Sequence, residues 1–167
     1  MSATRTQWYF AYGSNLDPRT FLGRRQMRPL RTSPARLDDW ALCFDLPVGP
    51  GERGVGNVRL QAGAVVWGVA YELGESDADR LDRTEGVHRG AYLRAPVQVE
   101  TVGGVILDAF TYHSQRGLAE RKPSRRYLGL LLAGARHHGL PADYVQMLRA
   151  IPLAVDERDK QMELPIR

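Results

Sequence analysis

Trp8-Tyr9-Phe10-Ala11-Tyr12-Gly13-Ser14-Asn15-Leu16, followed by Asp17-Pro18, is the stretch that decides the fold. Its opening run of apolar and aromatic residues is typical of a strand buried on both faces. Gly13-Ser14-Asn15 ends that strand, because these residues suit unusual backbone angles. Asp17 and Pro18 are residue types favoured at the N-cap and first position of a helix. We expect a short helix from Asp17 to about Arg25.

The loop between this strand and this helix has two interpretations. A strand that feeds a helix N-terminus directs backbone N–H groups and the positive end of the helix dipole to one place. An anion or a polarised carbonyl oxygen can be held there. An ordinary glycine-containing turn is the alternative, since such turns are common after strands. Local geometry alone leaves both interpretations open.

Length and composition indicate one globular domain over residues 1–167. The 167 residues are 43% hydrophobic and 25% charged, which is enough to form a core and argues against disorder. No run approaches a membrane span, and the N-terminus lacks an apolar signal-peptide core. One cysteine, Cys43, excludes an internal disulfide and fits a cytoplasmic location. The net charge of +4 comes without a basic block or an aromatic-interleaved basic stripe, so nucleic-acid binding is not expected.

Downstream of the opening stretch, strand patterns outnumber helix patterns. Alternating apolar residues predict strands at 40–46, 57–61, 64–73, 91–101 and 105–113. Helices are expected from a capping-box-like Ser76 to about Glu85, from Ser124 to Gly139, and from Pro141 to Ile151. Breakers predict a loop over 47–56 and a two-residue hairpin turn at Gly103-Gly104. Because strands and helices do not alternate, we predict an α+β fold with a mixed, strongly curved or barrel-like sheet and helices packed outside.

Several kinds of chemistry lack their motif. No His-Glu-x-x-His or Cys-x-x-Cys spacing supports a metal site, and the glycine-rich loops match no nucleotide fingerprint. Ser14 lacks the Gly-x-Ser-x-Gly elbow of serine hydrolases. Cys43 lies in an apolar run and is expected to be a buried structural thiol. The adjacent His137 and His138 are interpreted as favourable partners of a helix C-terminal dipole.

Glu85 is the candidate acid/base. It lies at the C-terminal end of a predicted helix, where the negative end of the dipole disfavours an ionised carboxylate. Burial in an apolar pocket would raise its pKa further, so that it could take and return a proton near neutral pH. The alternative is an exposed carboxylate at a helix end.

Motifs along most of the chain resemble the γ-glutamylcyclotransferase family of the AIG2-like superfamily. The resemblance is carried by Tyr12-Gly13-Ser14-Asn15-Leu16, by Val66-Trp67-Gly68-Val69, and by Leu81 to Val87 with Gly90-Ala91-Tyr92 after it. It continues through Lys122 to Tyr127 and to Gly139-Leu140-Pro141. The resemblance implies a small mixed β-barrel with flanking helices.

The resemblance also implies an activity without a cofactor or metal. The α-amine of a γ-glutamyl amide attacks its own δ-carbonyl, which releases 5-oxoproline and a free amine. The family's acid/base glutamate falls on Glu85. The substrate-binding positions fall on the loop and on aromatic residues of the pocket, namely Tyr12, Gly13, Ser14, Asn15, Leu16, Tyr92 and Tyr127, with Tyr112 as a further candidate. The loop at 47–56, which includes Arg53, is expected to set which amine is carried.

Two alternatives to this enzyme remain from the sequence. One is a non-catalytic module of the same fold that binds γ-glutamyl compounds. The other is nucleic-acid binding through the positive charge, which the scattered pattern disfavours. The expected partner is a small-molecule γ-glutamyl amide, with neither nucleic acid nor membrane, and the resemblance makes a homodimer plausible.

Overall fold

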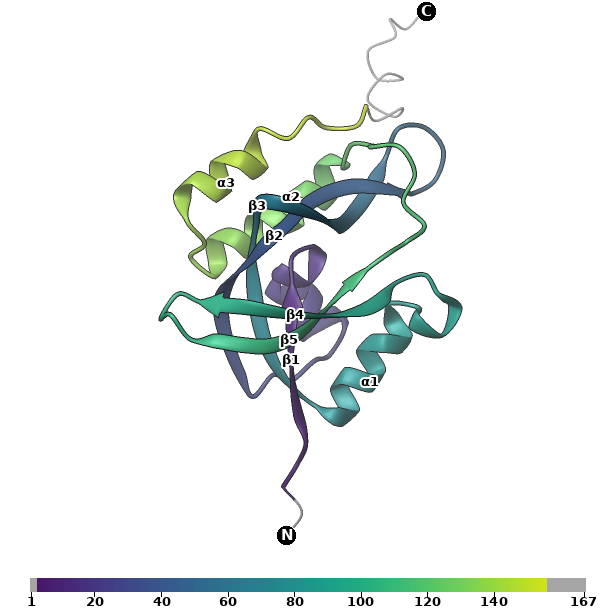
Figure 1. Cartoon of the computed structure of the whole chain (residues 1–167). Helices are drawn as coiled ribbons and strands as arrows, with labels where there is room; N and C mark the ends of the chain where they lie inside the picture. The colour runs from purple at the N-terminus through teal and green to yellow at the C-terminus, as the bar shows by residue number, and fades with distance from the viewer. Residues whose placement is uncertain (1–2, 156–167) are drawn as a thin grey trace, which may run out of the picture.

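The computed structural model describes residues 3–155, and in this range five strands close into a barrel (Figure 1). The strands are β1 (Thr6–Ala11), β2 (Arg31–Pro47), β3 (Gly54–Gly74), β4 (Leu93–Thr101) and β5 (Ile106–His113). Their order around the barrel is β1-β3-β2-β4-β5. β1 and β5 pair in parallel and the other neighbours pair antiparallel, so the predicted mixed barrel is confirmed.

Helices lie outside the barrel. α1 (Glu75–Thr84) follows β3 directly, while α2 (Arg125–His137) and α3 (Ala142–Arg149) pack on each other away from α1 (Figure 1). Three short helical turns complete the described chain: η1 (Ser14–Leu16), η2 (Arg19–Arg24) and η3 (Val87–Arg89). None of the helices described is long and apolar enough to cross a membrane.

β1 is buried on both faces, as its sequence predicts. Phe10 and Tyr12 pack into a cluster with side chains of β2, β3 and β4. Tyr9 and Ala11 point the other way, because side chains alternate along a strand, and pack with residues of η2 and α1. The end of β1 is therefore fixed between the sheet and the helices, and this fixes the start of the loop that follows.

The strands predicted at 57–61 and 64–73 are one strand, β3. Gly63 has a φ of +81°, and Asp39 on the paired strand has a φ of +65°, so both chains bend without separating. The Gly63 N–H donates to Asp39 Oδ1 over 2.9 Å. β2 likewise starts earlier than expected, at Arg31. The prediction of two short strands was wrong because a glycine that permits a bulge looks, in sequence, like a turn.

The loop predicted over 47–56 is shorter, because β2 ends at Pro47 and β3 begins at Gly54. Gly54, the first residue of β3, lies so close to neighbouring backbone that a side chain would not fit there. The Gly54 N–H donates to Lys122 O over 2.9 Å, and a Cβ on Gly54 would lie 2.1 Å from Phe44 O. The end of the predicted loop, from Gly54 on, is therefore strand backbone packed against its neighbours.

The starts of the helices follow the sequence only in part. Asp17 acts as a cap, since its Oδ2 accepts from the N–H of Thr20 over 3.1 Å, but the helix that follows is the single wide π-type turn of η2. The capping box expected at Ser76 was wrong. α1 has Gly74 as its N-cap with no side-chain cap, and Asp77 instead binds Arg28 and Arg80.

The C-terminal half follows the predicted boundaries closely. Ser124 Oγ accepts from the N–H of Tyr127 over 3.0 Å at the start of α2, and Gly139 follows its end in the left-handed conformation. The β4–β5 turn is longer than predicted, because Thr101 pairs with Val105 across three residues instead of two. Cys43 is 2% exposed, and burial raises the pKa of its thiol to about 12, as expected for a structural thiol.

Candidate functional site

A small cavity of about 220 Å³ opens where the end of β1 meets the end of α1. Its volume is below the roughly 300–1,000 Å³ of sites for drug-sized ligands, so it suits a group the size of one amino acid. The lining residues come from segments far apart in sequence: Tyr9, Tyr12, Gly13, Ser14, Asn15, Arg25, Val55, Gly56, Glu85, Tyr92, Tyr112 and Tyr127. The residues predicted from the sequence thus meet in one place, apart from Leu16.

The turn after β1 presents its first amides to this cavity. The Leu16 N–H donates to Gly13 O over 3.0 Å and the Asp17 N–H to Ser14 O over 3.1 Å, so these two amides are used inside the turn. Gly13, Ser14 and Asn15 all line the cavity. Leu16 itself is fully buried in the core, which corrects its expected place in the binding surface.

The backbone of Leu16 instead connects the turn to His138, the C-cap residue of α2. Its carbonyl oxygen lies 3.0 Å from His138 Nε2, and the same nitrogen lies 3.4 Å from the hydroxyl of Tyr71. Burial lowers the pKa of His138, so the ring is neutral at pH 7 and donates from Nε2 to Leu16 O. The expected role of His138 as a charged dipole partner is therefore replaced by a hydrogen bond that holds the turn.

Glu85 projects into the cavity from the end of α1. It is the C-cap residue, and Gly86 next to it has a φ of +70°. Its side chain is 15% exposed, and its Oε1 lies 3.3 Å from Asn15 Nδ2 and 3.8 Å from Arg25 Nη2. Burial raises the pKa of Glu85, and the nearby charge of Arg25 and the Asn15 hydrogen bond offset only part of that increase.

Asn15 connects the turn to the carboxylate. Its Nδ2 donates both to Glu85 Oε1 and to the hydroxyl of Tyr9, the latter over 3.0 Å. Its Oδ1 is buried without a hydrogen-bond partner among the described residues. An unpaired buried acceptor costs free energy unless something donates to it, and a ligand N–H in the cavity is such a donor.

Tyr92 and Tyr127, which the sequence predicted to line the site, both form hydrogen bonds with the backbone of Gly56. Tyr92 donates its hydroxyl hydrogen to Gly56 O over 2.8 Å, and the hydroxyl of Tyr127 accepts from Gly56 N over 3.0 Å. A Cβ on Gly56 would lie 2.8 Å from that hydroxyl, and a Cβ on Gly13 3.0 Å from it. Gly13 and Gly56 therefore both lie so close to the Tyr127 hydroxyl that a side chain at either position would crowd it. Burial raises the pKa of Tyr127 to about 12, so it stays neutral.

Sequence reasoning missed Tyr9, Arg25 and Gly56. Tyr9 carries a hydroxyl inside an otherwise apolar strand, and a buried hydroxyl requires a partner, which is the signal that was available. Arg25 follows η2 and is half-buried, and its Nε is buried without a partner among the described residues. No local pattern indicated that Arg25 would lie beside Glu85.

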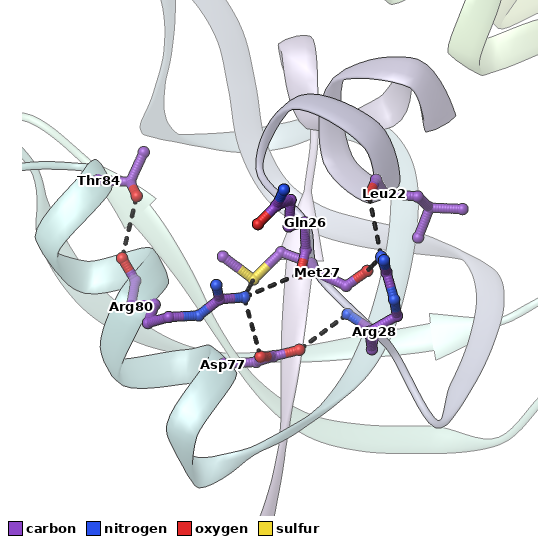
Figure 2. A network of polar contacts seen from close by, with 7 residues as sticks. All are labelled: Leu22, Gln26, Met27, Arg28, Asp77, Arg80 and Thr84. Carbon is purple, nitrogen blue, oxygen red and sulfur yellow. Dashed lines mark hydrogen bonds and ion pairs between the residues drawn. The ribbon is translucent and has the colours of Figure 1, made fainter.

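A polar network holds the segment after Arg25 against α1 (Figure 2). Asp77 Oδ2 accepts from the Arg28 N–H over 2.8 Å, and Arg80 Nη2 donates to Gln26 O over 2.9 Å. Arg80 also pairs with Asp77 over 3.1 Å. Because Arg25 precedes this segment and Glu85 ends α1, the network sets the distance between the two charged groups in the cavity.

The arrangement can exchange a proton and stabilise negative charge. A carboxylate with a raised pKa lies beside backbone amides that can bind an oxyanion, and an arginine lies nearby. Residues 3–155 contain no group of three or more His, Cys, Asp or Glu side chains that could hold a metal ion.

Comparison with known proteins supports one family. The model of the AIG2-like family matches residues 65–148. The γ-glutamylcyclotransferase of Bos taurus is 34% identical over 148 residues, covering 86% of this chain and 77% of the relative, and that of Homo sapiens is 33% identical over the same span. A solved γ-glutamyl cyclotransferase structure superposes with a TM-score of 0.77 at 29% identity, covering 95% of this chain and 98% of that one.

Proposed function

The chain belongs to the γ-glutamylcyclotransferase family within the AIG2-like proteins, and on this premise we propose that it converts γ-glutamyl amides into 5-oxoproline and a free amine. The observation that carries the proposal is the position of the Glu85 carboxylate, 3.3 Å from Asn15 in the turn that follows β1. The proposed acid/base and the turn proposed to bind the oxyanion line the same small cavity, which supports the proposal.

The proposed reaction is a unimolecular acyl transfer. The α-ammonium group of the glutamyl moiety gives a proton to Glu85, and the resulting amine attacks the δ-carbonyl carbon. A ring C–N bond forms, and the carbonyl oxygen carries the negative charge of the tetrahedral intermediate. When the original amide C–N bond breaks, Glu85 returns the proton to the departing nitrogen. The ring nitrogen then gives its remaining excess proton to the Glu85 carboxylate, which passes it to the solvent and is ready for the next turnover. One carboxylate therefore serves all of these transfers, and no nucleophile from the protein is needed.

The amides of Gly13, Ser14 and Asn15 are proposed to hold the developing oxyanion. Loss of a single oxyanion donor typically costs about 2.7–4 kcal/mol in other enzymes. The hydrogen bond from His138 to Leu16 and the cap at Asp17 keep the turn in place before substrate arrives. A pre-arranged turn loses little free energy to reorganisation during the reaction.

Arg25 is proposed to bind the α-carboxylate of the glutamyl group. The α-amine and α-carboxylate share one carbon atom, and Glu85 Oε1 and Arg25 Nη2 lie 3.8 Å apart, so one amino-acid end can contact both. This contact would direct the amine at Glu85 and leave the side chain to fold back for cyclisation. Tyr92 and Tyr127, fixed on Gly56, form the opposite wall.

A panel of γ-glutamyl dipeptides and γ-glutamyl alkylamines, analysed for 5-oxoproline by mass spectrometry, tests the proposal. We expect 5-oxoproline and an equal amount of amine from at least one member, with unchanged rates after treatment with a chelator. Ligand-induced thermal stabilisation without any 5-oxoproline across the panel would instead identify a non-catalytic binding module.

A further inference from the structure

A second, larger hollow of about 1100 Å³ adjoins the small cavity. The two share Ser14, Arg25, Val55 and Tyr127 as lining residues, so they are continuous at these side chains. The larger hollow, called here the basic groove, extends between η2, the β2–β3 loop and the N-terminal end of α2. The proposed chemistry uses only the small cavity and leaves this groove without a role.

Arginines dominate the charge of the basic groove. Its lining contains no aspartate or glutamate among the described residues, whereas it contains Arg24, Arg25, Arg53, Arg125 and Arg126. Arg25 faces Glu85, and the other four form no ion pair with a carboxylate of residues 3–155. These arginines come from three separate segments, namely η2 with the residue after it, the β2–β3 loop and the first turn of α2.

We infer that the basic groove is the subsite for the departing amine, and that it selects γ-glutamyl conjugates whose amine portion carries two negative charges, as an acidic amino acid does. This inference rests on the proposed function. The small cavity holds one glutamyl group, so the substituent on the δ-amide nitrogen must leave through the shared wall. Beyond Ser14 and Tyr127 that substituent enters the groove and meets the arginines.

The positions of the arginines favour a substituent with two separated anions. Arg53 is half-buried at the β2–β3 loop and its backbone bridges to Lys122, while Arg125 and Arg126 lie in the first turn of α2. The positive end of the α2 dipole adds to the attraction at that side. A leaving group with one carboxylate can contact the arginines of one segment, and a second carboxylate on its side chain allows it to contact the arginines of another segment as well.

A matched pair of substrates isolates the second charge. γ-Glutamylglutamate and γ-glutamylglutamine have almost the same shape, and differ by one negative charge on the departing residue. An exposed ion pair contributes about two- to fivefold in binding, so two or more arginines acting together predict a preference of about tenfold in kcat/KM for γ-glutamylglutamate. The preference should appear in KM and should shrink as salt rises from about 20 mM to about 500 mM.

Two variants test the assignment to these arginines. Arg53→Gln together with Arg126→Gln should reduce the preference towards onefold, because kcat/KM for γ-glutamylglutamate falls more than kcat/KM for γ-glutamylglutamine. Arg149→Gln, on the exposed side of α3 and outside the groove, lowers the net charge without touching the lining and should keep the preference. Lysine at positions 53 and 126 should restore most of it, because the charge is kept.

The outcomes separate this inference from the proposed function. Equal kcat/KM for the two peptides, or a preference that survives the double substitution, overturns the subsite while 5-oxoproline release still supports the activity. If neither peptide yields 5-oxoproline, calorimetric titration with the same two peptides tests the groove alone. Tighter binding of γ-glutamylglutamate that depends on positions 53 and 126 would support the subsite, and equal or absent binding would overturn it.

Discussion

Replacing Glu85 by glutamine changes one charge in the cavity and little else. Both contacts of the carboxylate are made by Oε1, to Asn15 over 3.3 Å and to Arg25 over 3.8 Å. Glutamine keeps a carbonyl oxygen at that position and places its amide nitrogen where Oε2 was. The turn, the tyrosines and Arg25 should therefore stay in place, and the substitution removes the ability to exchange a proton.

The expected loss of activity is large. A correctly placed acid/base contributes about 10²–10⁴-fold, which corresponds to about 2.7–5.5 kcal/mol in the barrier. We expect kcat to fall by that factor, while KM changes little because the binding contacts remain. In the wild type, kcat should also fall on the acid side as Glu85 becomes protonated, at a pH above that of an ordinary glutamate, because burial raises its pKa.

Although the Glu85→Gln substitution should lower activity, it should raise the stability of the folded protein at higher pH. Below the ordinary pKa of glutamate, the carboxyl is protonated in the folded and unfolded protein alike, so the two proteins should be about equally stable. As pH rises, the unfolded chain ionises first, and the wild type loses stability relative to the variant until the pH exceeds the raised pKa of folded Glu85. At pH 8 we therefore expect the variant to be more stable than the wild type and to have the higher Tm.

The assay combines 5-oxoproline release with thermal denaturation at pH 4 and pH 8. Glu75→Gln is a suitable control, since it makes the same chemical change at an exposed position of α1. Wild-type turnover by Glu85→Gln would refute the role of Glu85 as acid/base. A variant that is less stable than the wild type at pH 8 would refute the argument that burial disfavours the ionised carboxylate.

Three further substitutions test the surroundings of the site. Gly56→Ala places a Cβ 2.8 Å from the Tyr127 hydroxyl, so KM should rise and stability fall by about 1–3 kcal/mol, and an unchanged KM in steady-state kinetics would contradict the packing argument. Asp77→Asn weakens the contact with the Arg28 N–H, and kcat/KM should fall several-fold with about 1 kcal/mol of stability; a loss of stability alone would show that the network does not position the site. The buried side chain of Asn57 donates to Asp45 Oδ1 and to Ser114 O and accepts from the Ser114 N–H. Asn57→Leu leaves these partners unpaired and should lower the free energy of unfolding by about 3 kcal/mol in urea denaturation, whereas a loss below about 1 kcal/mol would show that water replaces the amide.

Local features of the sequence predicted well where a few adjacent residues decide the structure. The aromatic run before Gly13 predicted a strand buried on both faces, Ser124 predicted the start of α2, and Gly139 predicted its end. At both ends of α2, the deciding interaction is a backbone conformation or a hydrogen bond within about four residues. The same reasoning failed at Gly54 to Gly56, where glycine serves close packing to segments distant in sequence.

The opening stretch and Glu85 were both identified as candidates from the sequence, and the tertiary structure brought them together. Sequence placed Glu85 at a helix end, but its burial depends on Arg25 after η2, on the turn after β1, and on Tyr92 before β4 and Tyr127 of α2 packing around it. Arg25 and Gly56 likewise line the cavity only because segments distant in sequence pack together. Secondary structure is encoded by neighbours along the chain, whereas the desolvation of a carboxylate, and hence its pKa, is determined only when distant segments exclude water from it.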